Sequence, residues 1–264
     1  MSFISKLRAV SSVASASVSP SAGARSVTNA PATAVRSAYA RNLRVPAAPL
    51  HAPGGRSAAT AEENSARFSN GLKEFLWQIG DIGRGNLLDL GAVSQATLNY
   101  FIERNFKVYT EDLLAAWGAF LELDFAHAHS LPPEAERPDT SPAAQAMRFL
   151  ASNLRYPADS FDAILLWDVL DYMDREAANQ FLLRLTSLTR DGGAVLAIFH
   201  TRPPEQFQRY RVLDAHNLEL VSVPTLVRPR HVYQNREIQE LFEKFRTQKT
   251  FVSRDQLREG VFVK

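Results

Sequence analysis

The stretch from Asn86 to Asp112, NLLDLGAVSQATLNYFIERNFKVYTED, constrains the fold more than any other part of the chain. It begins with a short apolar run that ends at Gly91, which predicts a buried strand followed by a tight turn. Ser94 is a residue type that caps helix N-termini, and the apolar residues after it recur at helical spacing. A strand-like stretch then follows Asn105, a residue that tolerates a left-handed helix end. The sequence therefore predicts a strand–turn–helix–strand unit.

Such a unit brings two groups together at one edge of a parallel sheet. The turn after the first strand and the end of the second strand lie side by side there. Backbone N–H groups at the helix start and an acid at the second strand end then face one crevice. The acids in that position are Glu111 and Asp112. A carboxylate accepts hydrogen bonds from both hydroxyls of a ribose, so either acid is a candidate for binding a nucleoside-like cofactor.

These residues resemble the first motif of the class I S-adenosylmethionine-dependent methyltransferases, in which a strand ends in an acid and a glycine-rich turn. The motif here is LDLG at residues 88–91, and Asp112 lies at the family's usual distance from it for the acid that binds ribose. Val93 and Gln95 stand where the family usually repeats glycine. The resemblance implies S-adenosyl-L-methionine as the cofactor.

A second segment, FDAILLWDVLDYM at residues 161–173, continues the resemblance. Its fully apolar start is typical of a central parallel strand that is buried on both faces. Trp167 and Asp168 follow at the carboxyl end, where open α/β sheets bind ligands, and in the family this position borders the transferring methyl group. Asp168 and Asp171 are candidates to take or orient an acceptor's proton; the alternative for each is a charge that complements a helix N-terminus.

Two further sites complete the candidate set. His200, at the end of the next apolar strand, is a candidate base, the alternative being a plain strand-end histidine. The resemblance implies a third strand within residues 147–156, after which the family often places an acid that binds adenine. Asn153 follows Ala151 and Ser152 there, and its amide can bond an adenine edge. The full set is Asp168, Asp171 and His200 for catalysis, and Asp89, Gly91, Ala92, Glu111, Asp112, Asn153, Leu154 and Trp167 for the cofactor.

The remaining elements are predicted from apolar periodicity and from turn residues. They are helices at residues 62–79, 113–125, 175–189 and 235–245, a loop at 127–142, a turn at 190–193, a strand at 194–199, a hairpin at 209–223, and two final strands at 249–253 and 260–263. The fold class that follows is α/β: a Rossmann-like, doubly wound, seven-stranded and mostly parallel sheet with a C-terminal antiparallel strand pair, over residues 62–264.

Composition excludes several classes of function. The chain has 264 residues and no cysteine, so disulfides, thiolate catalysis and cysteine metal sites are excluded. No apolar run approaches the roughly 20 residues that a membrane helix needs, and the sequence predicts a soluble protein without a membrane partner. His127 and His129 lack a third ligand at a recognisable spacing, so no metal is expected.

The first 61 residues form a separate region in composition. They hold seven basic residues and no acid among Ala, Ser, Pro and Val, which predicts disorder. A bacterial low-complexity tail, with a cytoplasmic protein, and a mitochondrial transit peptide, with a matrix protein, both fit this composition. Seven of the chain's 30 basic residues lie there, which leaves 23 against 28 acidic residues in the rest. A mildly acidic domain argues against a nucleic-acid partner.

Two functions are consistent with these features. The first is an S-adenosylmethionine-dependent methyltransferase that acts on a small-molecule acceptor. The second is a catalytically inactive relative that serves as a binding or scaffold protein, suggested by the absent glycines and the absent adenine acid. A nucleotide-sugar or NAD enzyme is disfavoured, because the turn lacks the spaced glycines that let a pyrophosphate approach the helix start.

Overall fold

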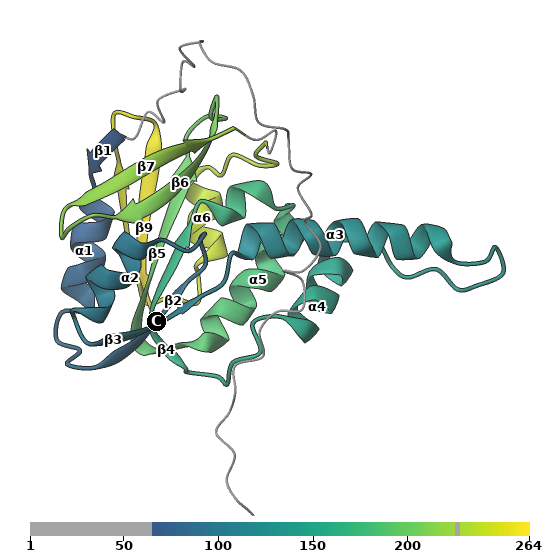
Figure 1. The fold of residues 1–264 in the computed structure, drawn as a ribbon, viewed down its shortest axis with the longest axis horizontal. Coiled ribbons are helices and arrows are strands. Elements are labelled where there is room, and N and C mark those ends of the chain that lie inside the picture. Colours follow the sequence, from purple (N-terminus) through teal and green to yellow (C-terminus); the bar gives the residue numbers. More distant parts are fainter. Residues whose placement is uncertain (1–64, 225–227) are drawn as a thin grey trace, which may run out of the picture. The chain divides into compact units, whose positions relative to one another are not determined.

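The computed structural model describes residues 65–224 and 228–264, and the expectation of a disordered tail at residues 1–61 lies outside the described residues. The main sheet has six strands in the order β3-β2-β4-β5-β9-β8 (Figure 1). Strands β3, β2, β4 and β5 are parallel to one another, while β9 is antiparallel to β5 and to β8. The strands are β2 Gly85–Asp89, β3 Phe106–Thr110, β4 Phe161–Trp167, β5 Thr189–His200, β8 Thr247–Val252 and β9 Leu257–Val263.

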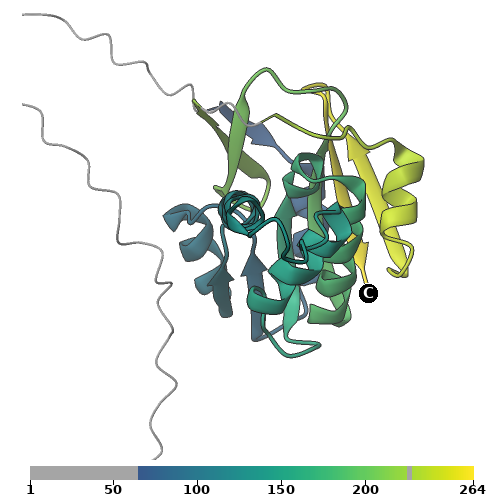
Figure 2. The same cartoon turned by 90° about the vertical axis from the view of Figure 1, so that its right-hand side faces the viewer.

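Helices cover both faces of this sheet (Figure 2). On one face α1 packs on β5 and β9, and α2 packs on β3. A cluster of apolar side chains that includes Phe75, Phe101 and Leu196 fills the space beneath them. On the other face α5 lies against α4, and a second apolar cluster contains Phe149, Phe181 and Phe262. The helices are α1 Asn70–Gln78, α2 Gln95–Ile102, α3 Leu113–Ser130, α4 Pro142–Ser152, α5 Arg175–Leu188 and α6 Asn235–Leu241.

A second, smaller sheet lies at the carboxyl end of the main sheet. It has three antiparallel strands in the order β1-β7-β6, which are β1 Ser65–Phe68, β7 Asn217–Val223 and β6 Phe207–Val212. The backbone N–H of Val212 donates to Oγ1 of Thr97 on α2 at 3.0 Å, and Tyr210 reaches Asp168 at the end of β4. These contacts place the small sheet over the edge where the sequence predicted a ligand site.

The predicted local signals of the first unit are confirmed. The Ser94 side chain accepts a hydrogen bond from the backbone N–H of Thr97 at the start of α2. Asn105 has a φ of 64°, so it holds the left-handed conformation between α2 and β3. The fully buried run of β4 has neighbouring strands on both sides, as its continuous apolar sequence indicates.

The predicted strand within residues 147–156 is wrong, and the main sheet therefore has six strands rather than seven. Residues 142–152 form helix α4 instead. Ser141 caps it by accepting from the N–H of Ala144, and Pro142 occupies the first turn, where its missing N–H costs nothing. Ala146 and Phe149 are buried three residues apart, which is helical rather than strand spacing.

Three predicted boundaries also need correction. Residues 65–68, placed in a helix, form strand β1, because they pair with β7 far along the chain. The helix after β3 continues to Ser130, so its last turn lies where a loop was predicted. Strand β5 begins at Thr189 rather than after the glycines, and Gly192 supplies the positive φ of 79° within it.

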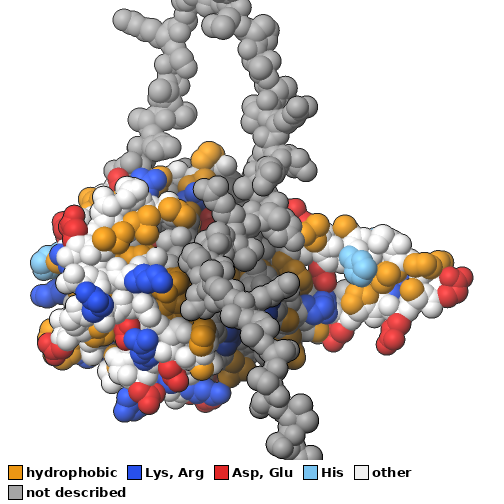
Figure 3. All heavy atoms as spheres, turned by 60° about the horizontal axis from the view of Figure 1, so that its bottom comes forward, with side chains coloured by type: hydrophobic (Ala, Val, Ile, Leu, Met, Phe, Trp, Pro, Cys, Tyr) orange, Lys and Arg blue, Asp and Glu red, His pale blue; other side chains and the backbone are white. Residues whose placement is uncertain are grey.

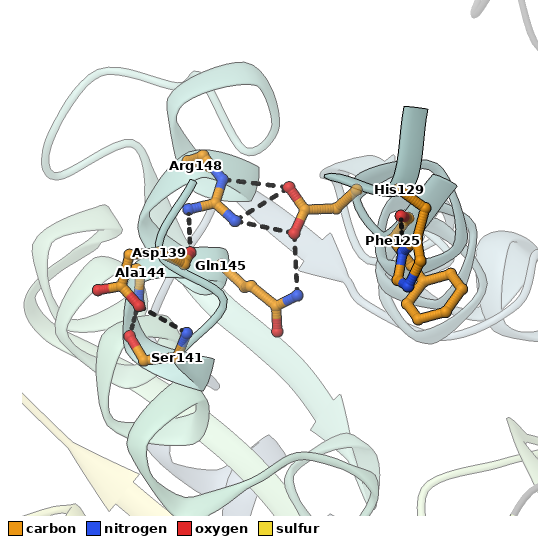
Figure 4. A network of polar contacts seen from close by, with 8 residues as sticks. Phe125, His129, Asp139, Ser141, Ala144, Gln145 and Arg148 are labelled. Atoms are coloured by element: carbon orange, nitrogen blue, oxygen red, sulfur yellow. Dashed lines mark hydrogen bonds and ion pairs between the residues drawn. The ribbon is translucent and has the colours of Figure 1, made fainter. Parts of the chain in front are cut away.

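Helix α3 extends away from the rest of the described fold (Figure 1). Leu123 and Phe125 are exposed there, and Figure 3 shows hydrophobic and acidic side chains on its surface. Asp124 fixes this helix to α4: its carboxylate accepts two hydrogen bonds from Nη2 of Arg148, at 2.8 and 2.9 Å, and one from Gln145 at 2.9 Å (Figure 4). Among the described residues, no helix combines the length and apolar character that a membrane span requires.

Candidate functional site

A cavity of about 470 Å³ opens at the carboxyl ends of β2 and β4, between α3 and the small sheet. We call it the first cavity. Its floor includes the turn after β2 and the end of β4, one wall is the face of α3, and the other is β6. Five of the predicted residues line it: Gly91, Ala92, Asp112, Trp167 and Asp168. The sequence-predicted crevice therefore exists, and it brings the glycine turn and the acid after β3 together.

The two acids after β3 have different surroundings. Asp112 caps α3, with Oδ1 accepting from the N–H of Ala115 at 3.2 Å, and its side chain is about one third exposed to the cavity. Its Oδ2 lies 3.9 Å from Nη2 of Arg209 on the opposite wall. Glu111 instead accepts a hydrogen bond from the hydroxyl of Tyr156 at 2.6 Å and does not line the cavity. Of the two, Asp112 is the carboxylate within reach of a ligand.

Asp89 lies behind the cavity floor and is held by Trp167. Its Oδ1 accepts from the indole Nε1 of Trp167 at 2.7 Å and from the N–H of Gly91 at 3.0 Å. Burial raises the pKa of Asp89 to about 6, although these hydrogen bonds oppose the rise. A Cβ at position 91 would meet the indole at 2.7 Å, so only glycine fits beside Trp167. The other side of the indole stacks on Tyr210 at a centroid distance of 5.7 Å.

The three candidate catalytic residues form one buried group. Asp168 ends β4, Asp171 lies in the short 3₁₀ helix η1 Val169–Tyr172, and His200 ends β5. Oδ2 of Asp171 accepts from the backbone N–H of His200 at 2.7 Å and lies 2.9 Å from its Nδ1. Nε2 of His200 lies 3.9 Å from Oδ2 of Asp168. With its proton on Nδ1, His200 donates a hydrogen bond to Asp171, and the lone pair on Nε2 then faces Asp168.

Burial controls the ionisation of both acids in this group. It raises the pKa of Asp168 to about 7, and the neighbouring His200 opposes the rise. Burial also raises the pKa of Asp171, and the hydrogen bonds from His200 oppose it. The hydroxyl of Tyr210 lies 3.4 Å from Oδ2 of Asp168. A carboxyl group that titrates near neutrality beside a histidine is suited to proton transfer.

Asn153 and Leu154 lie apart from the first cavity. Asn153 ends α4, and its Nδ2 donates to the carbonyl of Phe149 at 2.9 Å. The carbonyl of Leu154 accepts from Nη2 of Arg184 at 2.7 Å. Neither residue lines the first cavity, because the segment before them is a helix that packs on α5 rather than a strand at the sheet edge. A role for them in cofactor binding stays a prediction.

Sequence reasoning missed two walls of the cavity. One is the face of α3 that carries Ala115, Gly118 and Ala119, whose spacing of three and four residues puts them on one side of a helix. A Cβ added at Gly118 would meet nothing within 4 Å, so this wall is open. The other wall is the start of β6, residues 207–210, for which no motif gave a signal.

Comparisons with known proteins add likenesses of fold alone. No family model matches the chain, and no curated protein matches its sequence. The Burkholderia thailandensis 1,6-didemethyltoxoflavin-N1-methyltransferase, solved with 1,6-didemethyltoxoflavin and S-adenosylhomocysteine, is 18% identical over 74% of this chain and 76% of its own, with a TM-score of 0.39. A SAM-dependent methyltransferase from Methanosarcina mazei is 11% identical over 69% and 93%, with a TM-score of 0.37. A Rhodobacter sphaeroides protein provisionally named a Zn-dependent alcohol dehydrogenase is 14% identical over 75% and 90%, with a TM-score of 0.39.

The arrangement of the main sheet identifies the type of fold. Four parallel strands are followed by an antiparallel pair, helices cover both faces, and the acid-glycine turn follows β2. The chain has a Rossmann-like α/β fold. This fold has one strand fewer than the resemblance implies, since α4 takes the place of the third strand. At 11–18% identity the compared structures do not identify a cofactor or an acceptor for this chain.

Proposed function

We propose that the chain is an S-adenosylmethionine-dependent methyltransferase that acts on a small-molecule acceptor and binds its cofactor in the first cavity. The observation that carries the proposal is that the Gly91 turn and Asp112 line the same cavity, at the ends of neighbouring parallel strands. The cavity volume of about 470 Å³ lies within the range of roughly 300 to 1,000 Å³ that is usual for small-molecule sites.

The cavity residues suit an adenosyl cofactor. The accessible carboxylate of Asp112 can accept hydrogen bonds from the two ribose hydroxyls. Leu90, Leu114 and Ala119 provide apolar surface for a flat base, and the open wall at Gly118 leaves room for it. These residues, with the backbone of the turn after Gly91, would hold the cofactor.

The catalytic tasks left to the chain are small. When bound, the cofactor supplies an electrophilic methyl group on a sulfonium, so the protein has to align an acceptor and exclude water. His200 is oriented by Asp171 and can take the proton that the acceptor loses. Asp168, with its pKa near 7, stands between His200 and the first cavity and can hold that proton or pass it on.

One observation favours a second function, a binding protein without catalysis. The indole of Trp167 packs against Gly91, and its N–H occupies Oδ1 of Asp89. A ligand group that needs Asp89 has to displace this side chain from a buried hydrogen bond, which costs roughly 1 to 3 kcal/mol. A chain that keeps Trp167 in place would bind a nucleoside without using Asp89.

Calorimetric titration of the full chain with S-adenosylhomocysteine and S-adenosylmethionine tests the proposal. Wild-type protein is expected to bind both, and Asp112→Ala is expected to weaken binding by roughly 1.5 to 3 kcal/mol, the range for a hydrogen bond to a charged group. Asp81→Ala, an exposed acid outside the cavity, is the matched control and should bind as the wild type does. Absence of heat and of a thermal shift at millimolar ligand would defeat the proposal.

An unchanged affinity in Asp112→Ala would instead remove Asp112 from the site. Glu111→Ala distinguishes the remaining possibility, because Glu111 is bonded to Tyr156 and does not line the first cavity. We expect that variant to lose stability through the unpaired hydroxyl of Tyr156 while its cofactor affinity stays unchanged.

A further inference from the structure

A second cavity, of about 530 Å³, lies between the small sheet and the end of β5. Its walls come from β1, β7, the loop between β5 and β6, and the turn between β8 and β9. His200 forms part of its inner wall. Its lining is far more polar than that of the first cavity, and it includes the hydroxyl-bearing Ser65 and Ser222. A polar cavity with a histidine in its wall suits a small polar ligand.

The two cavities are adjacent. Gln208, on β6, lines both of them. Asp168 lines the first cavity and His200 lines the second, and their side chains approach to 3.9 Å. A molecule in the second cavity therefore lies next to the contents of the first, and movement of the Gln208 side chain is the change that would join them.

The charges around the second cavity are of both signs. Arg202 and Glu205 lie on the loop after β5, both exposed, with Pro203 and Pro204 between them. Neither forms an ion pair with another residue in the described part of the chain, whereas Asp255 at the opposite wall is paired with Arg67 at 2.7 Å. Two opposite charges that both lack an ion-pair partner among the described residues complement a ligand that carries both signs better than they complement a simple ion.

We propose that the second cavity binds the methyl acceptor, and that this acceptor is a small zwitterion of the amino-acid type. The inference rests on the proposed function. The carboxylate of the zwitterion pairs with Arg202 and its ammonium with Glu205, while its accepting hydroxyl or nitrogen faces His200. A bound S-adenosylmethionine, held in the first cavity by Asp112 and the turn after Gly91, would supply the methyl group and leave as its demethylated product, and His200 would take the proton that the acceptor loses.

Titration of the full chain with L-serine, followed by NMR of ¹⁵N-labelled histidine and by calorimetry, tests this proposal. We expect L-serine to shift the His200 imidazole signals and to bind at least about tenfold more tightly than propionate or ethanolamine, each of which carries one of its two charges. Arg202→Gln and Glu205→Gln should each reduce L-serine affinity at least about fivefold. Arg236→Gln, an arginine on α6 that is 88% exposed, is the matched control and should bind L-serine unchanged.

Three results would overturn the proposal. They are no binding of L-serine, equal affinity for L-serine, propionate and ethanolamine, and L-serine binding that neither Arg202→Gln nor Glu205→Gln alters. The same samples titrated with S-adenosylhomocysteine separate the two hypotheses. Binding of S-adenosylhomocysteine without L-serine binding defeats the second cavity as the acceptor site and leaves the methyltransferase proposal standing. Binding of L-serine without S-adenosylhomocysteine defeats the methyltransferase proposal, and the second cavity then remains a zwitterion site alone.

Discussion

Replacing Asp168 with asparagine should change how the stability of the protein depends on pH. Burial raises the pKa of this carboxyl from 3.8 to about 7, so the folded state holds a proton that the unfolded state releases near pH 4. The stability that this proton contributes is complete below pH 4 and is lost as the pH rises towards 7. One pH unit corresponds to 1.36 kcal/mol, so titration of Asp168 lowers the free energy of unfolding of the wild type by roughly 2 to 3 kcal/mol between pH 5 and pH 7.

Urea denaturation at pH 5 and at pH 7 measures this loss. Asp168→Asn cannot ionise and has nearly the same shape, so its free energy of unfolding should fall less between the two pH values, by roughly 2 to 3 kcal/mol. Asp89, whose pKa is raised to about 6, titrates in both proteins, so its contribution to the pH dependence cancels in the comparison. Asp81→Asn, at an exposed position, should show the pH dependence of the wild type. An equally steep fall in Asp168→Asn would refute the idea that Asp168 is buried with its proton.

Two further predictions concern the stability of the fold, one through side-chain packing and one through an ion pair, and both are measured by urea denaturation. Gly91→Ala places a Cβ 2.7 Å from the Trp167 indole and should lower the free energy of unfolding by roughly 1 to 3 kcal/mol. Gly118→Ala is the comparison: a Cβ there meets nothing within 4 Å, and because alanine favours a helix the free energy of unfolding should rise by up to about 1 kcal/mol. Losses of the same size in both variants would contradict the contact geometry. Arg148→Ala removes the guanidinium that binds Asp124. It should lower the free energy of unfolding by roughly 1 to 3 kcal/mol and speed amide hydrogen exchange in α3. Unchanged exchange in α3 would show that the contact does not hold the helix.

The features that the sequence predicted correctly depend on neighbouring residues. The cap at Ser94 and the left-handed turn at Asn105 are set by side chains within three residues of the position concerned. The buried run of β4 is readable because a strand covered on both faces has no polar side to display. The first cavity followed from the same logic, since the βαβ unit fixes where Gly91 and Asp112 meet.

The errors arose where distant partners decide the outcome. Residues 65–68 are a strand because β7, some 150 residues later, supplies their hydrogen bonds. Helix α4 is a different case, because its signals are local: the cap at Ser141 and the helical spacing of Ala146 and Phe149 both indicate a helix, and a third strand there is only what the resemblance implies. The β6 wall of the cavity had no local signal, because its position depends on how the small sheet docks on the main one.

Strand β1 connects the start of the described chain to its C-terminal strands. Arg67 joins it to the β8–β9 region through Asp255 and Glu259, each at 2.7 Å, and Glu259 is almost completely buried. Removal of Arg67 would leave the buried Glu259 without its guanidinium, and removal of all of β1 would expose the hydrogen-bonding edge of β7. A shortened chain that begins beyond Arg67 is therefore expected to be less stable than one that keeps β1.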